Sequence, residues 1–182
     1  LVDILGIPVI TGMSSVDALE SDHPYFVGRS GGTGTRPGNF ALQNSDVLLS
    51  IGNRQGFAQT GFQYQDWARE SYTILNDIDE NELKKPSLHV SLPVIGDAGE
   101  LIRGLLAEAE KRGADKGHPL FKGDEWRKQC LLWKEIYPVV TAKHYETIEE
   151  GCTNIYAFYG ELSKAMKENE TLMVSVGTSR VA

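Results

Sequence analysis

The strongest fold signal in this chain is the run Gly28-Arg29-Ser30-Gly31-Gly32-Thr33-Gly34-Thr35-Arg36-Pro37-Gly38-Asn39. Five of these residues are glycines, and the run stands between a short apolar segment and a segment with helical spacing. Glycine has no Cβ atom, so its backbone can take a positive φ and be approached closely. A turn that leads into a helix also presents N–H groups that favour an anion. The run predicts either a phosphate-facing turn or a flexible surface loop, although its spacing matches neither the Walker loop nor the dinucleotide fingerprint.

Apolar runs on both sides of this turn predict buried strands. Residues 7–11 are mostly β-branched and lie between two glycines, and residues 46–52 form a continuous apolar run that ends in glycine. Further segments are predicted as extended at 72–79 and 88–95 and as a helix, capped by Asp97, at 98–111. Strands that are apolar throughout are buried on both faces, as in parallel sheets. The alternation of strands and helices predicts an α/β fold with a Rossmann-like open parallel sheet and flanking helices.

The composition changes after residue 112, where lysine, glycine, aspartate and proline predict a linker. A helix over 124–136 follows, and its two tryptophans and Cys130 share one face, which we interpret as a docking face. A second helix over about 153–167 and a strand over 172–176 predict the start of a second α/β domain. The chain is thus divided into a first domain at 1–107, a linker with a helix at 108–150, and the start of the next domain at 151–182.

Charge and residue usage exclude several classes of function. Lys and Arg number 18 against 25 Asp and Glu, and the net charge of −7 argues against a nucleic-acid surface. The sequence contains no run of 18 apolar residues, so we expect no membrane span. The two cysteines are not clustered with histidines, so we expect reduced thiols, a cytoplasmic protein and no metal site within this chain.

Taken in order, these pieces resemble the middle domain of the thiamine-diphosphate-dependent enzymes of the acetolactate synthase type. The resemblance is carried by Pro8-Val9-Ile10-Thr11, Asp22-His23-Pro24, Gly31 through Arg36, Asn39, Ala41, Ser45-Asp46-Val47-Leu48-Leu49, Ile51-Gly52-Asn53-Arg54, Thr60-Gly61, Asp77-Ile78-Asp79 and Gly96-Asp97-Ala98. From about residue 153, the helix and the strand ending Ser175-Val176-Gly177-Thr178 resemble the opening of the family's third domain, which binds the cofactor diphosphate.

The resemblance implies a nucleotide cleft, because some members hold FAD or ADP in this domain in an accessory role. The residues that it assigns to cofactor binding are Gly31, Gly32, Gly34 and Arg36 at the diphosphate, Asp77 and Asp79 near the ribose, and Gly96 and Asp97 near the adenine. FAD-binding members usually carry a Met-Gly-Lys-Gly pattern after the second strand. Here residues 13–17 read Met-Ser-Ser-Val-Asp, which argues against flavin because an aspartate repels phosphate.

The resemblance also implies that this chain is a fragment with no catalytic residues of its own. The family's first strand and its N-terminal domain, which supplies the glutamate that activates thiamine, are expected before Leu1. The Gly-Asp-Gly motif that holds Mg²⁺ is expected beyond Ala182. The parent enzyme would use thiamine diphosphate and Mg²⁺ to decarboxylate a 2-keto acid and pass the carbanion to an acceptor, as a lyase or transferase.

Two other functions remain open from the sequence. One is an independent nucleotide-binding module of Rossmann-like fold that takes FAD, ADP or NAD, and the other is a structural domain with an empty cleft. For the leading reading, the expected partners are the other domains of the same enzyme and further copies in a homo-oligomer, because the absence of the first strand exposes a sheet edge. No nucleic acid or membrane partner is expected.

Overall fold

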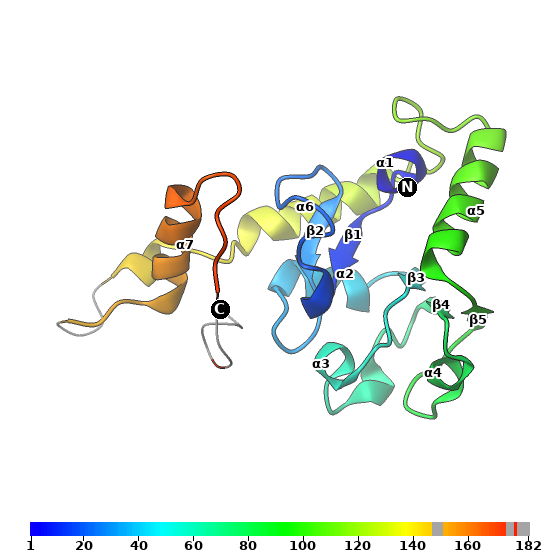
Figure 1. Cartoon of the computed structure of the whole chain (residues 1–182), viewed down its shortest axis with the longest axis horizontal. Helices are drawn as coiled ribbons and strands as arrows, with labels where there is room; N and C mark the ends of the chain where they lie inside the picture. The colour runs from blue at the N-terminus through cyan, green and yellow to red at the C-terminus, as the bar shows by residue number, and fades with distance from the viewer. Residues whose placement is uncertain (147–150, 174–176, 178–182) are drawn as a thin grey trace. The chain divides into compact units, whose positions relative to one another are not determined.

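The computed structural model describes residues 1–146, 151–173 and 177. The chain forms two compact units, residues 1–136 and residues 137–182. In the first unit, helices flank two small open sheets of parallel strands (Figure 1). This arrangement confirms the predicted α/β, Rossmann-like fold class.

The strands of the first unit form two separate sheets. They span Val9–Thr11 (β1), Phe26–Arg29 (β2), Val47–Ile51 (β3), Tyr72–Asp77 (β4) and Leu92–Ile95 (β5). One sheet pairs β1 with β2, and the other has the order β3-β4-β5, with every pair parallel. In the central strand β4, the neighbouring side chains of Leu75 and Asn76 point to opposite faces. Their exposed fractions are only 3% and 1%, as expected for a strand that is covered on both faces.

Three helices of the first unit begin after a polar side chain that accepts from one of their first free N–H groups. The helices of the first unit are α1 (Val2–Leu5), α2 (Arg36–Gln43), α3 (Phe57–Thr60), α4 (Glu80–Lys84), α5 (Ala98–Lys111) and α6 (Asp124–Ile136), with 3-10 turns at Met13–Ser15 and Tyr64–Asp66. The Asp97 carboxylate accepts from the Glu100 N–H at 3.0 Å and begins α5 at the predicted residue. Thr35 caps α2 in the same way, accepting from the Gly38 N–H at 3.2 Å.

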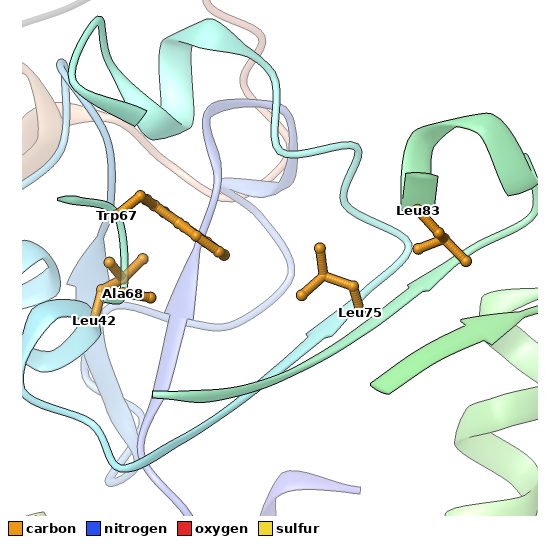
Figure 2. Close-up of a cluster of buried hydrophobic side chains, with 5 residues drawn as sticks. All are labelled: Leu42, Trp67, Ala68, Leu75 and Leu83. Atoms are coloured by element: carbon orange, nitrogen blue, oxygen red, sulfur yellow. The ribbon is translucent and has the colours of Figure 1, made fainter. Parts of the chain in front are cut away.

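A buried apolar cluster joins the second sheet to α2. Figure 2 shows its five members, Leu42, Trp67, Ala68, Leu75 and Leu83, which come from α2, the segment before β4, β4 itself and α4. Half-buried Ile10 of β1 and Leu48 of β3 pack against the same cluster. The two sheets therefore share one apolar layer.

The helix predicted inside the linker belongs to the first unit. In α6, Cys130 is fully buried and packs with Val27 and Ala41 of β2 and α2, beside Trp126 and Trp133. The Lys134 ammonium donates to the Ser21 carbonyl at 2.6 Å and to the Phe26 carbonyl at 2.9 Å. The predicted docking face is thus occupied within the chain.

The boundary between the two compact units lies between residues 136 and 137 of the chain, whereas the sequence predicted boundaries near 107 and 150. The linker prediction for 108–150 therefore does not describe the packing of α6, because a helix with a buried tryptophan face gains stability by covering a neighbour. The division into family domains at 1–107, 108–150 and 151–182 stays a prediction.

The second unit contains a 3-10 turn at Ala142–Tyr145 and α7 at Ile155–Ala165. Asn154 caps α7 by accepting from the Tyr156 N–H at 2.9 Å. The Tyr145 hydroxyl donates to the Glu161 carboxylate at 2.8 Å and ties the turn to the helix. Of the strand predicted over 172–176, residues 174–176 lie outside the described residues.

Candidate functional site

The glycine-rich turn between β2 and α2, residues 30–35, satisfies its own amides. The Gly31 N–H donates to the Asn39 side chain at 2.8 Å, and the Asn39 amide donates back to the Gly31 carbonyl at 3.1 Å. The Gly32 N–H donates to the Ala58 carbonyl and the Gly34 N–H to the Gly31 carbonyl, both at 3.0 Å. These donors are the ones that a diphosphate would need, and they are already in use.

The glycines of this β2–α2 turn instead permit close packing. A Cβ atom at Gly38 would lie 2.6 Å from the carbonyl carbon of Arg29, and one at Gly34 would lie 2.5 Å from its carbonyl oxygen. Gly31 has a φ of +101°, which side chains rarely adopt. The spacing of these glycines lets α2 lie directly on the end of β2.

The acidic candidates act as caps and turn acceptors. The Asp77 carboxylate accepts from the Asp79 N–H at 3.0 Å, and the Asp79 carboxylate accepts from the Asn81 N–H at 2.9 Å at the start of α4. Asp97 caps α5. The Gly96 N–H donates to the Asp77 carbonyl at 3.1 Å, so Asp77 and Gly96 are neighbours across β4 and β5.

The predicted site residues therefore form two groups at the carboxyl ends of strands. Gly31, Gly32, Gly34 and exposed Arg36 follow β2, and Asp77, Asp79, Gly96 and Asp97 follow β4 and β5. The spatial orders β2-β1 and β3-β4-β5 put β1 and β3 between these groups. The assignment of all eight residues as cofactor ligands stays a prediction.

The turn after β3, residues 52–56, carries polar side chains that the sequence did not single out. Gln55 is buried with a φ of +49°, and its side-chain amide donates to Ser50 at 2.8 Å. The Lys85 ammonium donates to the carbonyls of Arg54 and Gln55, the latter at 3.1 Å, and pairs with Glu82 at 3.1 Å. The bonds from Lys85 to the two carbonyls, together with the ion pair of Arg54 and Glu82 at 2.8 Å, tie the β3–α3 turn to α4 and the residue after it. No glycine or motif in the sequence marks a buried glutamine with positive φ, so this feature becomes visible only in the fold.

Besides the Trp67 indole N–H, three buried side-chain oxygens on β1, β4 and the turn after β3 have no hydrogen-bond partner among the described residues. They are the Thr11 hydroxyl, the Gln55 side-chain carbonyl and the Asn76 side-chain carbonyl. Buried polar atoms without partners cost free energy, so most are paired in native proteins. Thr11 lies beside the start of the glycine-rich turn, since the Ser30 N–H donates to its carbonyl, whereas Gln55 and Asn76 belong to the other sheet and the turn that follows it.

Beside the β3–α3 turn lies an open groove with an aromatic floor. It is lined by Arg54, Gln55, Gly56, Phe57, Thr60, Gly61, Phe62, Tyr64, Glu82, Lys85 and Ser87. The rings of Phe57 and Phe62 meet edge to face, with centroids 4.6 Å apart, and both side chains are exposed. Tyr64 and two glycines line the groove beside this pair, together with the polar residues Arg54, Gln55, Thr60, Glu82, Lys85 and Ser87.

Reactive and metal-binding groups are sparse in the described part of the chain. Burial raises the pKa of the Cys130 thiol to about 11, so this thiol is neutral and unreactive at ordinary pH. Among residues 1–146, 151–173 and 177, no three His, Cys, Asp or Glu side chains are grouped as metal ligands. In the same residues, no helix is long and apolar enough to cross a membrane.

The sequence model of one family, described as the thiamine pyrophosphate enzyme, central domain, matches residues 1–105. The chain belongs to this family. Residues 1–105 include both sheets and α2 to α4, so this central domain accounts for the fold of most of the first unit.

Curated relatives of the central domain are acetolactate synthase large subunits. The probable acetolactate synthase large subunit of Methanococcus aeolicus is 34% identical over 110 residues, which are 60% of this chain and 18% of that protein. The corresponding protein of Methanocaldococcus jannaschii is 36% identical over 107 residues, 59% of this chain and 18% of that protein. The large subunit of Porphyra purpurea is 26% identical over 148 residues, 81% of this chain and 24% of that protein. The chain thus matches less than a quarter of the length of these relatives.

The family implies thiamine diphosphate, and the described residues do not fit that cofactor by themselves. They hold no cluster of metal ligands, and the Gly31, Gly32 and Gly34 amides are internally bonded. After β1, where flavin-binding members carry glycines, the Gly12 N–H donates to the Ser15 hydroxyl at 3.1 Å. The turns that could face a diphosphate are closed by their own hydrogen bonds.

Proposed function

We propose that this chain is part of a thiamine-diphosphate-dependent enzyme that decarboxylates a 2-keto acid such as pyruvate and joins the resulting carbanion to an acceptor. The observation that carries this proposal is the match of residues 1–105 to the central domain, together with relatives named as acetolactate synthase large subunits. An independent nucleotide-binding module receives no support from these relatives.

Within that enzyme, the chain serves as a scaffold. The carboxylates of Asp79 and Asp97 cap helices, and the buried thiol of Cys130 fills a core, so these three groups are engaged in structure. Thiamine diphosphate supplies an electron sink for decarboxylation when it is bound. In this proposal the cofactor and its Mg²⁺ are held by other domains of the same enzyme, in a homo-oligomer, and this chain orients those domains.

The test is the protein encoded by the full reading frame around residues 1–182. We expect acetolactate to form from pyruvate when thiamine diphosphate and Mg²⁺ are present, and to disappear when either is withheld. The matched control replaces Trp133 of α6 by alanine, which loosens the packing of α6 on α2 without touching a cofactor. A full protein that binds thiamine diphosphate but leaves every 2-keto acid unchanged would contradict the proposal.

A further inference from the structure

The short helix α3 lies against the carboxyl ends of β1 and β2, the two strands of the smaller sheet (Figure 1). The Gly32 N–H, in the turn after β2, donates to the Ala58 carbonyl at 3.0 Å. The Gln59 side-chain amide donates to the Ser30 hydroxyl at 3.3 Å. In parallel α/β sheets, ligands bind outside the carboxyl ends of the strands. Residues 58 and 59 therefore cover the place from which a ligand would approach these two strands.

Two glycines make room for α3 at these strand ends. A Cβ atom at Gly12, directly after β1, would lie 2.7 Å from the side-chain nitrogen of Gln59. A Cβ atom at Gly31, after β2, would overlap the Ala58 carbonyl oxygen and lie 2.8 Å from the side-chain oxygen of Gln59. The Gln59 side chain thus fits against both strand ends at once, in space that the absence of two Cβ atoms provides.

The residues around Gln59 face solvent. Phe57 and Ala58 are exposed, and the Phe57 ring packs on the ring of Phe62, which is itself exposed. An added Cβ at Gly56, which precedes the helix, or at Gly61, which follows it, would meet no atom within 4 Å. Gln59, by contrast, is half-buried. The side chain of Gln59 therefore anchors a segment whose ends are open.

Two polar groups at the strand ends take their partner from α3. They are the Gly32 N–H and the Ser30 hydroxyl. The other turn donors are bonded locally, the Gly31 N–H to Asn39 and the Gly34 N–H to the Gly31 carbonyl. When α3 moves away, the first two groups become free to donate to an anion, whereas the other two stay engaged. The contact with α3 is thus the part of the closed turn that can open without unfolding it.

We propose that Gln59 determines the ligand specificity of the first unit by holding α3 over the ends of β1 and β2, which excludes a nucleotide diphosphate from them. The Gln59 amide and the Ala58 carbonyl satisfy the Ser30 hydroxyl and the Gly32 N–H, the two groups that a phosphate oxygen would otherwise use. This exclusion is a property of the first unit alone. It holds whether or not the whole protein acts on 2-keto acids.

The experiment compares two glycine substitutions in α3 of the full chain, residues 1–182. Gln59→Gly removes the side chain that bonds the end of β2. Thr60→Gly is the matched control, because Thr60 lies in the same helix and its hydroxyl bonds a carbonyl of the same segment. We expect amide hydrogen exchange of Gly32 to be about 10-fold faster in Gln59→Gly than in Thr60→Gly. Exchange of Gly34, which bonds within its own turn, should change less than about 2-fold.

Gly12→Ala displaces Gln59 by a different route. The new Cβ meets the end of a flexible side chain, so the Gln59 amide can leave Ser30 while the residue itself stays in the chain. The backbone at Gly12 has a φ of −89° and a ψ of 174°, which alanine also adopts. We expect the same faster exchange of Gly32. Adding Gly12→Ala to Gln59→Gly should bring no further change, because both act on one contact.

Ligand exclusion is tested with ADP as the probe, through the amide NMR shift of Gly32. The apparent dissociation constant falls in proportion to the open fraction of the turn. We therefore expect Gln59→Gly to bind ADP at least about 10-fold more tightly than the unaltered chain, and Thr60→Gly to bind it no more tightly. Gly12→Ala decides the same question should Gln59→Gly not fold.

Three results would overturn the proposal. Unchanged exchange of Gly32 in both Gln59→Gly and Gly12→Ala would show that Gln59 does not hold α3 in place. Equal acceleration in Gln59→Gly and Thr60→Gly would point to general loosening of the helix. Faster exchange without tighter binding of ADP would mean that the bonds within the turn, and not Gln59, exclude the ligand.

Discussion

In the β2–α2 turn the amides of Gly31, Gly32 and Gly34 are all bonded within the chain, whereas beside the β3–α3 turn the side-chain carbonyl of Gln55 is buried and unpaired. The first turn is dense in glycine and the second holds a glutamine at positive φ. Glycine density therefore marks close packing of α2 on β2, and the unpaired carbonyl of Gln55 lies in a turn of the other sheet. The comparison teaches that donors must be counted before a turn is assigned to a phosphate.

The largest expected effect comes from closing the contact between α2 and β2. Gly38→Ala places a Cβ 2.6 Å from the Arg29 carbonyl carbon, and backbone cannot yield as a flexible side chain can. We expect the free energy of unfolding in urea to fall by about 3 kcal/mol or more. The control is Gly32→Ala, where no atom lies within 4 Å of the new Cβ and the change should be under about 1 kcal/mol. An equal fall in the free energy of unfolding of the two variants would contradict the conclusion that Gly38 is required for the close contact of α2 with β2.

The second prediction compares the stability lost on removing two threonine hydroxyls, one with hydrogen-bond partners and one without. The Thr35 hydroxyl accepts from the N–H groups of Arg29 and Gly38, both at 3.2 Å, so Thr35→Val leaves two donors without an acceptor. We expect a loss of about 2 kcal/mol in the free energy of unfolding. Thr11→Val removes a buried hydroxyl that has no partner, and it should be neutral or stabilising by up to about 1 kcal/mol. A strongly destabilising Thr11→Val would show that its hydroxyl has a partner in solution.

A third effect concerns the β3–α3 turn alone. Lys85→Met removes the ammonium that donates to the Arg54 and Gln55 carbonyls and pairs with Glu82. We expect the free energy of unfolding to fall by about 1 kcal/mol. Lys84→Met is the matched control, because Lys84 is exposed and pairs with Glu80 on the helix surface. Such a pair contributes at most about 0.5 kcal/mol to the free energy of unfolding. Identical denaturation curves for the Lys85 and Lys84 variants would remove the Lys85 contacts from this account.

The smallest expected effect is nucleotide binding at the β2–α2 turn. Because its amides are in use, ADP should bind there with a dissociation constant above about 1 mM, and the purified chain should be colourless, without stoichiometric FAD. Titration with ADP is followed by the amide NMR shifts of Gly31, Gly32 and Gly34. Saturable shifts at micromolar ADP, or a flavin absorption band that survives gel filtration, would contradict the conclusion that the amides of the β2–α2 turn are not free to bind a diphosphate.

Local signals in the sequence predicted much of the fold. The helix 98–111 appears at its predicted residues because its cap, Asp97, and its apolar spacing are local signals. The strands Val47–Ile51 and Tyr72–Asp77 lie within the segments predicted as extended, 46–52 and 72–79. The packing of α6 could not be predicted, since Trp133 reaches Phe40 more than ninety residues earlier, at a ring distance of 5.6 Å. A contact of that sequence separation depends on the whole fold.

The candidate site was predicted less well than the fold. The resemblance indicated the right strand ends, but it could not show that the Gly32 N–H donates to Ala58, because that bond needs α3 beside the turn. Likewise, glutamine is not a residue that favours positive φ, so the conformation of Gln55 follows from its burial and from Lys85 rather than from local preference.

The burial of Cys130 gives the chain two thiols of very different reactivity. Its pKa of about 11 keeps it protonated, while Cys152 is exposed to solvent. A maleimide dye added at neutral pH should therefore attach at Cys152 alone, giving a singly labelled protein without mutagenesis. Slow attachment of a second dye would then label Cys130 when α6 detaches from the first unit. The rate of this second labelling would measure the rate of local opening.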